Sequence, residues 1–320
     1  MYEWPMNKKA LILCLIILPT LVNAQRWKRQ RYEWVAAVGA TQFLGDVGGR
    51  NQIGSDWFFD LDAASTRYVA NIGFRYKISQ YVSAKTGFSF GEVYGDDKYT
   101  QEPFRNNRNI HFRSPIVEWA TQIEVSWMRE QIGSRYKIRR VRGRGRKGSR
   151  VFVYGFAGVA LLYMNPMAKY DGKWHSLRKL KTEGQDFVPS RKMYSNWQFT
   201  IPFGIGMKYA VDKKSSIGLE YGLRKTFTDY MDDVSTTYVY TRHAPNEAAL
   251  RNMLDYDDVA ANLADPSLAR VPEGIDAFEG ACSACPGQQR GDPTDLDSYM
   301  FLIITYQRKI RTTRKGLPKF

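Results

Sequence analysis

The sequence predicts an all-β fold: an eight-stranded antiparallel transmembrane β-barrel with a cleaved N-terminal signal peptide and long outer loops. The first observation is the segment from Trp197 to Val211, where every large apolar residue stands at an odd position and the even positions are small or polar. Because side chains alternate between the two faces of a strand, this segment has one apolar face. It is also longer than the ~9–11 residues that a tilted strand needs to cross a bilayer.

Strand number and composition also predict a membrane barrel. Seven other segments read as strands, and a closed single-chain barrel of this type has an even number of strands. Aromatic residues make up 14% of the 320 residues, including 20 Tyr and 8 Trp. Such rings are favoured at membrane–water interfaces. After residue 24 no run of about 18 apolar residues occurs, so we expect no membrane-spanning helix.

The expected strands follow one another through residue 306. In chain order they are Tyr32–Asp46, Tyr68–Ile78, Val82–Gly91, Val117–Trp127, Val151–Tyr163, Trp197–Val211, Ile217–Arg224 and Tyr299–Tyr306. The second, third, fourth, sixth and seventh have a clear apolar parity, whereas the fifth is apolar on both faces. The parity of the first, fifth and eighth stays unassigned. Pro202 cannot donate to a strand ladder, so we expect a local bulge there.

The lengths of the connections indicate the orientation. They are long after strands one, three, five and seven, and short after strands two and six. Extended outer loops and tight periplasmic turns have this pattern in outer-membrane barrels. Both termini of the barrel are therefore expected in the periplasm, with the chain in the outer membrane of a Gram-negative bacterium.

The N-terminus has the features of a signal peptide, residues 1–24. Lys8 and Lys9 form its positive region, Ala10–Leu21 its apolar core and Val22–Ala24 its small-residue cleavage site. The alternative is an N-terminal membrane anchor. Cleavage leaves a barrel domain of residues 25–320 with two cysteines, Cys282 and Cys285. An even count in an exported chain favours a disulfide, while the C-x-x-C spacing leaves redox chemistry or half a zinc site open.

Charged residues fall on the faces predicted to point inward. An eight-stranded barrel is only wide enough for its own side chains, and unpaired buried charges are expensive. We therefore expect a packed charge network in the barrel interior, with a selective pore as the alternative. Its members are Arg75, Lys77, Lys85, Glu118, Glu124, Lys208, Glu220 and Arg224.

The connection between strands four and five breaks the length pattern. Residues 129–150 hold ten Lys or Arg against one acid, Glu130. With the segments Arg26–Arg31 and Arg308–Lys319, they make the periplasmic side strongly basic. Export argues against nucleic acid, which leaves anionic phospholipid or, as we favour, an acidic periplasmic protein. The expected partner-binding residues are Arg135, Lys137, Arg139, Arg140, Arg142, Arg144, Arg146 and Lys147.

The last outer loop, residues 229–297, is acidic instead. It has fourteen Asp or Glu against four Lys or Arg, a net charge of −10. Pro245–Glu247, followed by apolar residues from Leu250 to Val259, suggests a short amphipathic helix. Asp255, Asp257, Asp258 and Asp265 do not match the spacing of a calcium loop, so the sequence favours a solvated acidic face over a metal site.

Catalytic signals are weak. The chain has three histidines, and the most plausible pair is His111 with Ser114, three residues apart. No nucleophile elbow or third triad member accompanies them. A histidine that packs in a loop is the favoured interpretation, so we expect no enzyme activity, no cofactor and no metal.

Two stretches resemble a known family. Val38–Gly48 resembles the first strand and glycine-rich exit of the PorG family, and Phe104–Glu118 is similar to its R-N-x-x-F-R-S start of strand four. The resemblance covers about Tyr32 to Trp127. It implies a non-enzymatic outer-membrane barrel of the type IX secretion system, attached to a periplasmic ring of the PorK lipoprotein and PorN. The alternatives are a surface adhesin or sensor acting through the acidic outer loop, or a lipid-modifying enzyme centred on His111.

Overall fold

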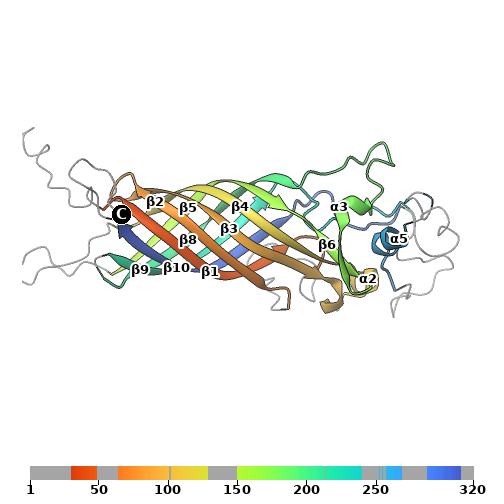
Figure 1. Cartoon of the computed structure of the whole chain (residues 1–320), viewed down its shortest axis with the longest axis horizontal. Helices are drawn as coiled ribbons and strands as arrows, with labels where there is room; N and C mark the ends of the chain where they lie inside the picture. The colour runs from red at the N-terminus through yellow and green to blue at the C-terminus, as the bar shows by residue number, and fades with distance from the viewer. Residues whose placement is uncertain are drawn as a thin grey trace, which may run out of the picture.

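The structure, a computed structural model, describes residues 30–48, 64–100, 102–128, 150–212, 214–239, 252, 254, 257–268 and 287–310. Within them one antiparallel sheet closes on itself because β3 pairs with both β2 and β4. The ring order is β3-β2-β1-β10-β9-β8-β5-β4 (Figure 1). Its strands are β1 (Tyr32–Leu44), β2 (Arg67–Lys77), β3 (Val82–Asp96), β4 (His111–Ser126), β5 (Val151–Met164), β8 (Trp197–Ala210), β9 (Ser215–Thr226) and β10 (Ser298–Ile310).

The outer wall of the barrel is apolar. All eight odd-numbered residues from Trp197 to Val211 are exposed, as the alternation predicts. Large exposed side chains on the other strands include Ile72, Trp119 and Ile304. Closure pairs every strand with two neighbours, which is the only way that strands can cross hydrocarbon. The predicted closed, eight-stranded antiparallel barrel with an apolar outer wall is therefore confirmed.

The parities that the sequence left open are settled by burial. In the first half of β1 the exposed residues are even-numbered, so Glu33 and Val35 point inward. β10 likewise exposes Leu302, Ile304 and Tyr306. In β5 the even positions are buried. Its inward residues are Phe152, Tyr154, Phe156, Ala160, Leu162 and Met164, which is why the strand looks apolar on both faces.

The bulge expected at Pro202 is absent. β8 keeps one register with β9 through the proline, where Pro202 stands opposite Arg224. Against β5 the register is also the same on both sides of the proline, from Ala160–Thr200 to Ala157–Phe203. The strands therefore accommodate the missing donor by skipping pairs in the β5–β8 ladder, without inserting a residue.

The connections divide between the two ends as predicted. Residues 78–81 and 211–214 form short turns at the end where β1 begins and β10 ends, and β4 and β5 leave residues 127–150 at that same end. The opposite end carries the long connections (Figure 1). There β3 and β4 run on past the other strands, from Gly91–Ile116 to Asp96–His111.

The outer end holds elements that the sequence analysis missed. A hairpin of β6 (Met167–Tyr170) and β7 (Lys173–Ser176) extends the edge of β4. Short helices there are α2 (Pro103–Arg108), α3 (Leu177–Leu180) and α5 (Asp258–Ala264), with a 3-10 turn η2 (Asp97–Tyr99). Within the acidic loop, Asn252 is helical and α5 begins at Asp258, whereas the expected helix start near Pro245 lies outside the described residues. None of the helices in the described ranges is long and apolar enough to span a membrane.

We predict a depth-dependent penalty for arginine on the outer wall. Ile304 lies at the midpoint of β10 and is 58% exposed, whereas Val211 lies in a periplasmic turn and is 51% exposed. Ile304→Arg should lower the free energy of unfolding by roughly 2–4 kcal/mol, and Val211→Arg by about 0–1 kcal/mol. Denaturant titration in phospholipid vesicles measures both. Equal losses would contradict the placement of Ile304 at the centre of the bilayer.

Candidate functional site

The inner half of the lumen is filled by a charge network around Glu220. Lys85 on β3 donates to both oxygens of Glu220, at 2.8 and 2.6 Å, and the Tyr154 hydroxyl donates to it at 2.6 Å. Arg75 lies 3.7 Å from the same carboxylate. Each member is almost fully buried. Strands β2, β3, β5 and β9 are therefore bridged across the lumen by one acidic side chain.

Arg75 extends this network to the other wall. Its guanidinium contacts Glu124 on β4, with a closest approach of 2.6 Å, and Glu33 on β1 at 3.1 Å. Lys77 pairs with the second oxygen of Glu33 at 2.7 Å. Burial of a charge is tolerated when it is paired and hydrogen-bonded, which holds for this guanidinium with its three carboxylate neighbours.

A second, smaller group lies nearer the outer end. Arg224 approaches Glu118 to 3.5 Å and stacks on the Phe301 ring at 3.9 Å. The Tyr299 hydroxyl donates to the same oxygen of Glu118. Lys208, the remaining residue predicted for the interior, is also buried on the inner face of β8. All eight predicted interior residues therefore point into the lumen.

Sequence reasoning missed the partners that complete these groups. Glu33 was overlooked because the parity of the first strand was unassigned, although Tyr32 and Trp34 flank it as an alternating pattern would require. Tyr154 and Tyr299 were missed because the parity of the fifth and eighth strands was also unassigned. A tyrosine hydroxyl on the inward face of a strand can donate to a buried carboxylate, so a search for such donors would have identified both residues.

Apolar side chains fill the outer part of the lumen. Phe43 packs edge-on against Phe112, with ring centroids 4.8 Å apart. Met231 and Val234, from the connection after β9, are fully buried in the same cluster. The expectation of a polar core therefore holds for only part of the barrel, because the loops fold inward and bring their own apolar residues to its mouth.

Arg108 ties three outer connections together. It forms an ion pair with Asp97 at 2.7 Å and donates to the carbonyl oxygens of Asp46 and Arg290. Asp97 in turn accepts from the backbone N–H of Gly48 at 3.2 Å. Gly48 has a φ of +86°, a conformation that favours glycine. The two stretches that resemble the PorG family thus meet in one junction at the outer mouth.

Glu183 joins the remaining outer connections. It accepts from Arg290 at 2.9 Å and from the backbone N–H of Ser235 at 2.9 Å. Asp233 accepts from the hydroxyls of Thr182 and Tyr194. We call the outer connections joined through Arg108 and Glu183 the outer cap. It closes the mouth with buried hydrogen bonds that link distant parts of the chain.

Asp229, Asp232 and Asp297 are buried close to one another inside the outer cap. Burial, followed by the negative charge of Asp46 and Glu183, raises the pKa of Asp229 to about 8. Burial raises the pKa of Asp297 and of Asp232 well above the usual value, and each is raised further by its acidic neighbours. The acidic loop is therefore not simply a solvated face. Asp265, expected on that face, is also buried and accepts from Ser267, although Asp257 and Asp258 are exposed.

His111 and Ser114 each accept a hydrogen bond from the backbone of the segment that follows β5. The His111 Nε2 accepts from the backbone N–H of Lys169 at 3.0 Å, and its ring lies edge-on to Trp174. Ser114 is fully buried and its hydroxyl accepts from the N–H of Asn165 at 3.1 Å. Both residues hold the β6–β7 hairpin region against β4. Among the described residues no group of three His, Cys, Asp or Glu is arranged to hold a metal ion.

The periplasmic rim is basic where the structure describes it. Arg150, Lys214 and Arg308 are exposed there, and Arg31 is half-buried beside Tyr76, with an N–O distance of 2.9 Å. Asp212 is the acidic residue in the turn after β8. The eight predicted partner-binding residues between Arg135 and Lys147, the signal peptide, and Cys282 with Cys285 lie outside the described residues.

Neither a protein-family model nor a curated protein matches the sequence. Solved outer-membrane barrels are similar in structure. Neisserial surface protein A is 9% identical, with a TM-score of 0.37 over 87% of this chain and 96% of its own. The N-terminal barrel domain of Pseudomonas aeruginosa OprF (9% identity, TM-score 0.31) covers 87% of this chain and 98% of its own. Ail of Yersinia pestis has the same identity and TM-score, over 87% of this chain and 99% of its own.

We predict that loss of Glu220 destabilises the barrel strongly. Glu220→Ala leaves Lys85 and Arg75 buried with fewer partners, which typically costs about 3–5 kcal/mol in the free energy of unfolding. Glu92→Ala is the matched control, because Glu92 faces the half-exposed Arg67 and Arg113 at 3.7 and 4.0 Å. That change should cost at most about 1 kcal/mol. Denaturant unfolding in vesicles compares the two, and similar losses would contradict a stabilising network.

We predict that the outer cap loosens as pH rises. A raised pKa means that the folded chain holds protons that the unfolded chain has released. For Asp229 this contribution to stability is complete below about pH 4, and it is lost as the pH rises towards and through about 8. Asp229→Asn should therefore be more stable than the parent at pH 9, and the difference should shrink steadily as the pH falls to 5.

The measurement is the free energy of unfolding across this pH range, together with hydrogen exchange of residues 228–236. Asp171→Asn is the control, because Asp171 is exposed in the β6–β7 turn. It should leave the profile unchanged. An unaltered profile for Asp229→Asn would contradict the burial of this carboxyl group in the folded cap.

Proposed function

We propose that this barrel is a non-enzymatic component of a type IX protein secretion system, which anchors or organises the periplasmic PorK/PorN ring through its basic periplasmic face. The observation that carries the proposal is the position of the charge. The ten Lys or Arg of residues 129–150 connect the periplasmic ends of β4 and β5. A barrel with this charge on its periplasmic side presents a docking surface for an acidic protein.

The described rim supports the same proposal. Arg150, Lys214 and Arg308 surround the lumen at the end that also receives the basic N- and C-terminal segments. The surface potential of this end is therefore positive, whereas the connection after β9 at the far end has a net charge of −10 over residues 229–297. Such a dipolar molecule favours different partners at its two ends.

The filled lumen supports a scaffold over a conducting pore. Arg75, Glu220 and their partners occupy its inner half, and Phe43, Phe112 and Met231 lie in its outer part. A substrate would have to displace buried ion pairs and packed apolar side chains to pass. The resemblance of residues 32–127 to the PorG family is the reason for proposing the PorK/PorN ring as the partner.

A surface adhesin or sensor is the second candidate, and the outer cap is the observation that favours it. Arg108 and Glu183 hold the outer connections in one arrangement, so the cap is a defined surface. Buried aspartates beneath it make that surface responsive to pH. The two candidates differ in which end of the molecule meets its partner.

We predict that the basic segment retains the ring. Changing the eight Lys and Arg residues between Arg135 and Lys147 to Gln should abolish co-purification of ring proteins from detergent-solubilised membranes, because the charge attraction is removed. A variant with residues 135–147 in scrambled order keeps the charge, and it should retain at least part of the ring. Folding of both variants is checked by the heat-dependent mobility of the barrel in gels.

Shortening Tyr136–Gly148 to a four-residue turn is the stricter test. Loss of secretion with an intact barrel is the expected result. If the barrel assembles and all cellular function survives, ring docking through this segment is wrong. Extracellular ligands in the eluate, in place of ring proteins, would favour the adhesin or sensor.

A further inference from the structure

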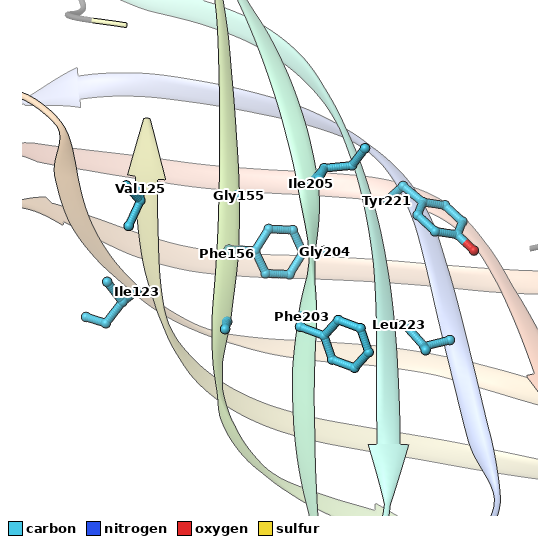
Figure 2. Close-up of a pocket in the computed structure, with 10 residues that line it drawn as sticks. Ile123, Val125, Gly155, Phe156, Phe203, Gly204, Ile205, Tyr221 and Leu223 are labelled. Atoms are coloured by element: carbon cyan, nitrogen blue, oxygen red, sulfur yellow. The ribbon is translucent and has the colours of Figure 1, made fainter. Parts of the chain in front are cut away.

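The lipid-facing wall is hollowed at one place. A groove of about 570 Å³ runs over β5 beside Gly155 (Figure 2). Its floor is formed by the outward positions Gly155 and Ala157. Bulky side chains flank it on both sides: Ile123 and Val125 on β4, and Phe203 and Ile205 on β8. Tyr221 and Leu223 on β9 extend the second side.

The groove arises from side-chain size in register. Gly155 stands between Val125 and Ile205, and Ala157 between Ile123 and Phe203. A Cβ added at Gly155 would meet only the Gly204 carbonyl oxygen, at 3.8 Å, so the position is open to the outside. The hollow is therefore one strand wide, with walls about 10 Å apart from backbone to backbone, since neighbouring strands lie ~4.8 Å apart.

The dimensions suit a single hydrocarbon chain. A water-sized group occupies roughly 30 Å³ in a liquid, so a hollow of this volume has room for well over ten methylene groups. A strand of a second barrel, with side chains on its lipid face, would not enter a hollow that is one strand wide. An acyl chain would, and it has no polar group that the apolar lining would leave unpaired.

A cation lies at the periplasmic end of β5, outside the lining of the groove itself. Arg150 immediately precedes β5 and is exposed, and its guanidinium lies 3.4 Å from the Tyr209 hydroxyl on β8. Trp127 on the β4 side is 89% exposed, and its backbone N–H donates to the Val153 carbonyl oxygen. Arginine is suited to phosphate, and Tyr and Trp are enriched at the headgroup level.

The distance between cation and groove matches one leaflet. Gly155 is five residues from Arg150, roughly 17 Å along the strand. Half of the hydrocarbon core is about 15 Å thick. A lipid whose phosphate meets Arg150 can therefore lay its chain over Gly155 and Ala157.

We propose that this groove binds one phospholipid of the periplasmic leaflet, with its phosphate on Arg150 and Tyr209 and one acyl chain over Gly155 and Ala157. The periplasmic position of Arg150 selects the leaflet. The groove is independent of the ring proposed above, since its lining belongs to the barrel wall, whereas Arg150 is shared with the basic periplasmic rim.

The test is native mass spectrometry of the full mature chain in detergent, titrated with dioleoyl phosphatidylglycerol. One lipid should stay bound at concentrations where further adducts are absent. Gly155→Leu fills the groove and should weaken this binding roughly tenfold or more. Ala36→Leu, on the lipid-facing side of β1 between Tyr306 and Ile72, is the matched control and should leave it unchanged.

A second variant tests the headgroup. Arg150→Gln should weaken phosphatidylglycerol binding and remove its advantage over dioleoylglycerol, which has the same chains without a phosphate. Ala157→Leu replaces Gly155→Leu if the latter fails to show the heat-dependent gel mobility of a folded barrel. Unchanged lipid binding in the groove-filling variant would overturn the proposal, as would a dimer of the parent that this variant abolishes, because a second copy would then occupy the groove.

Discussion

Hydrocarbon offers no partner to a backbone N–H or C=O group, and the rest of this structure depends on that constraint. It forces the sheet to close, which β3 achieves by pairing with both β2 and β4. Closure with eight strands leaves a lumen only as wide as its own side chains. Polar inward side chains must therefore find partners inside the ring. Arg75 and Lys85 both find one in Glu220.

The same constraint explains how much of the fold the sequence could predict. Each strand has lipid on one face and the packed interior on the other. Its sequence therefore alternates between apolar and polar residues wherever these two environments differ in polarity, and there the strand could be predicted. The alternation failed at β5, whose own inward side chains, among them Phe152 and Phe156, are largely apolar like its outward ones. The bulge at Pro202 was wrong because a ladder can skip pairs while it keeps its register.

The outer cap could not be predicted, because its contacts join residues far apart in the sequence. Arg108 contacts the carbonyl oxygen of Arg290, 182 residues away, and no local pattern marks that pairing. The members of the interior network could be predicted, since strand parity shows which charged residues point inward. Which of them pair could not be predicted, because this depends on how the closed ring brings β1, β4 and β9 together. Glu33 shows the limit, because one unassigned parity hides an essential partner. The buried aspartates of the cap were misjudged for a related reason: a net charge of −10 suggests exposure until the fold encloses it.

The seam between β1 and β10 has a consequence for biogenesis. These strands come from opposite ends of the barrel domain, so the ring is completed only after the whole domain has been delivered. Before completion, Gln307 on β10 lacks the partner that Arg75 on β2 provides, whereas Glu33 already stands opposite Arg75 in the β1–β2 ladder. An open sheet carrying these groups would be rejected by the bilayer. Formation of the seam therefore completes the backbone ladder and the interior network at the same step.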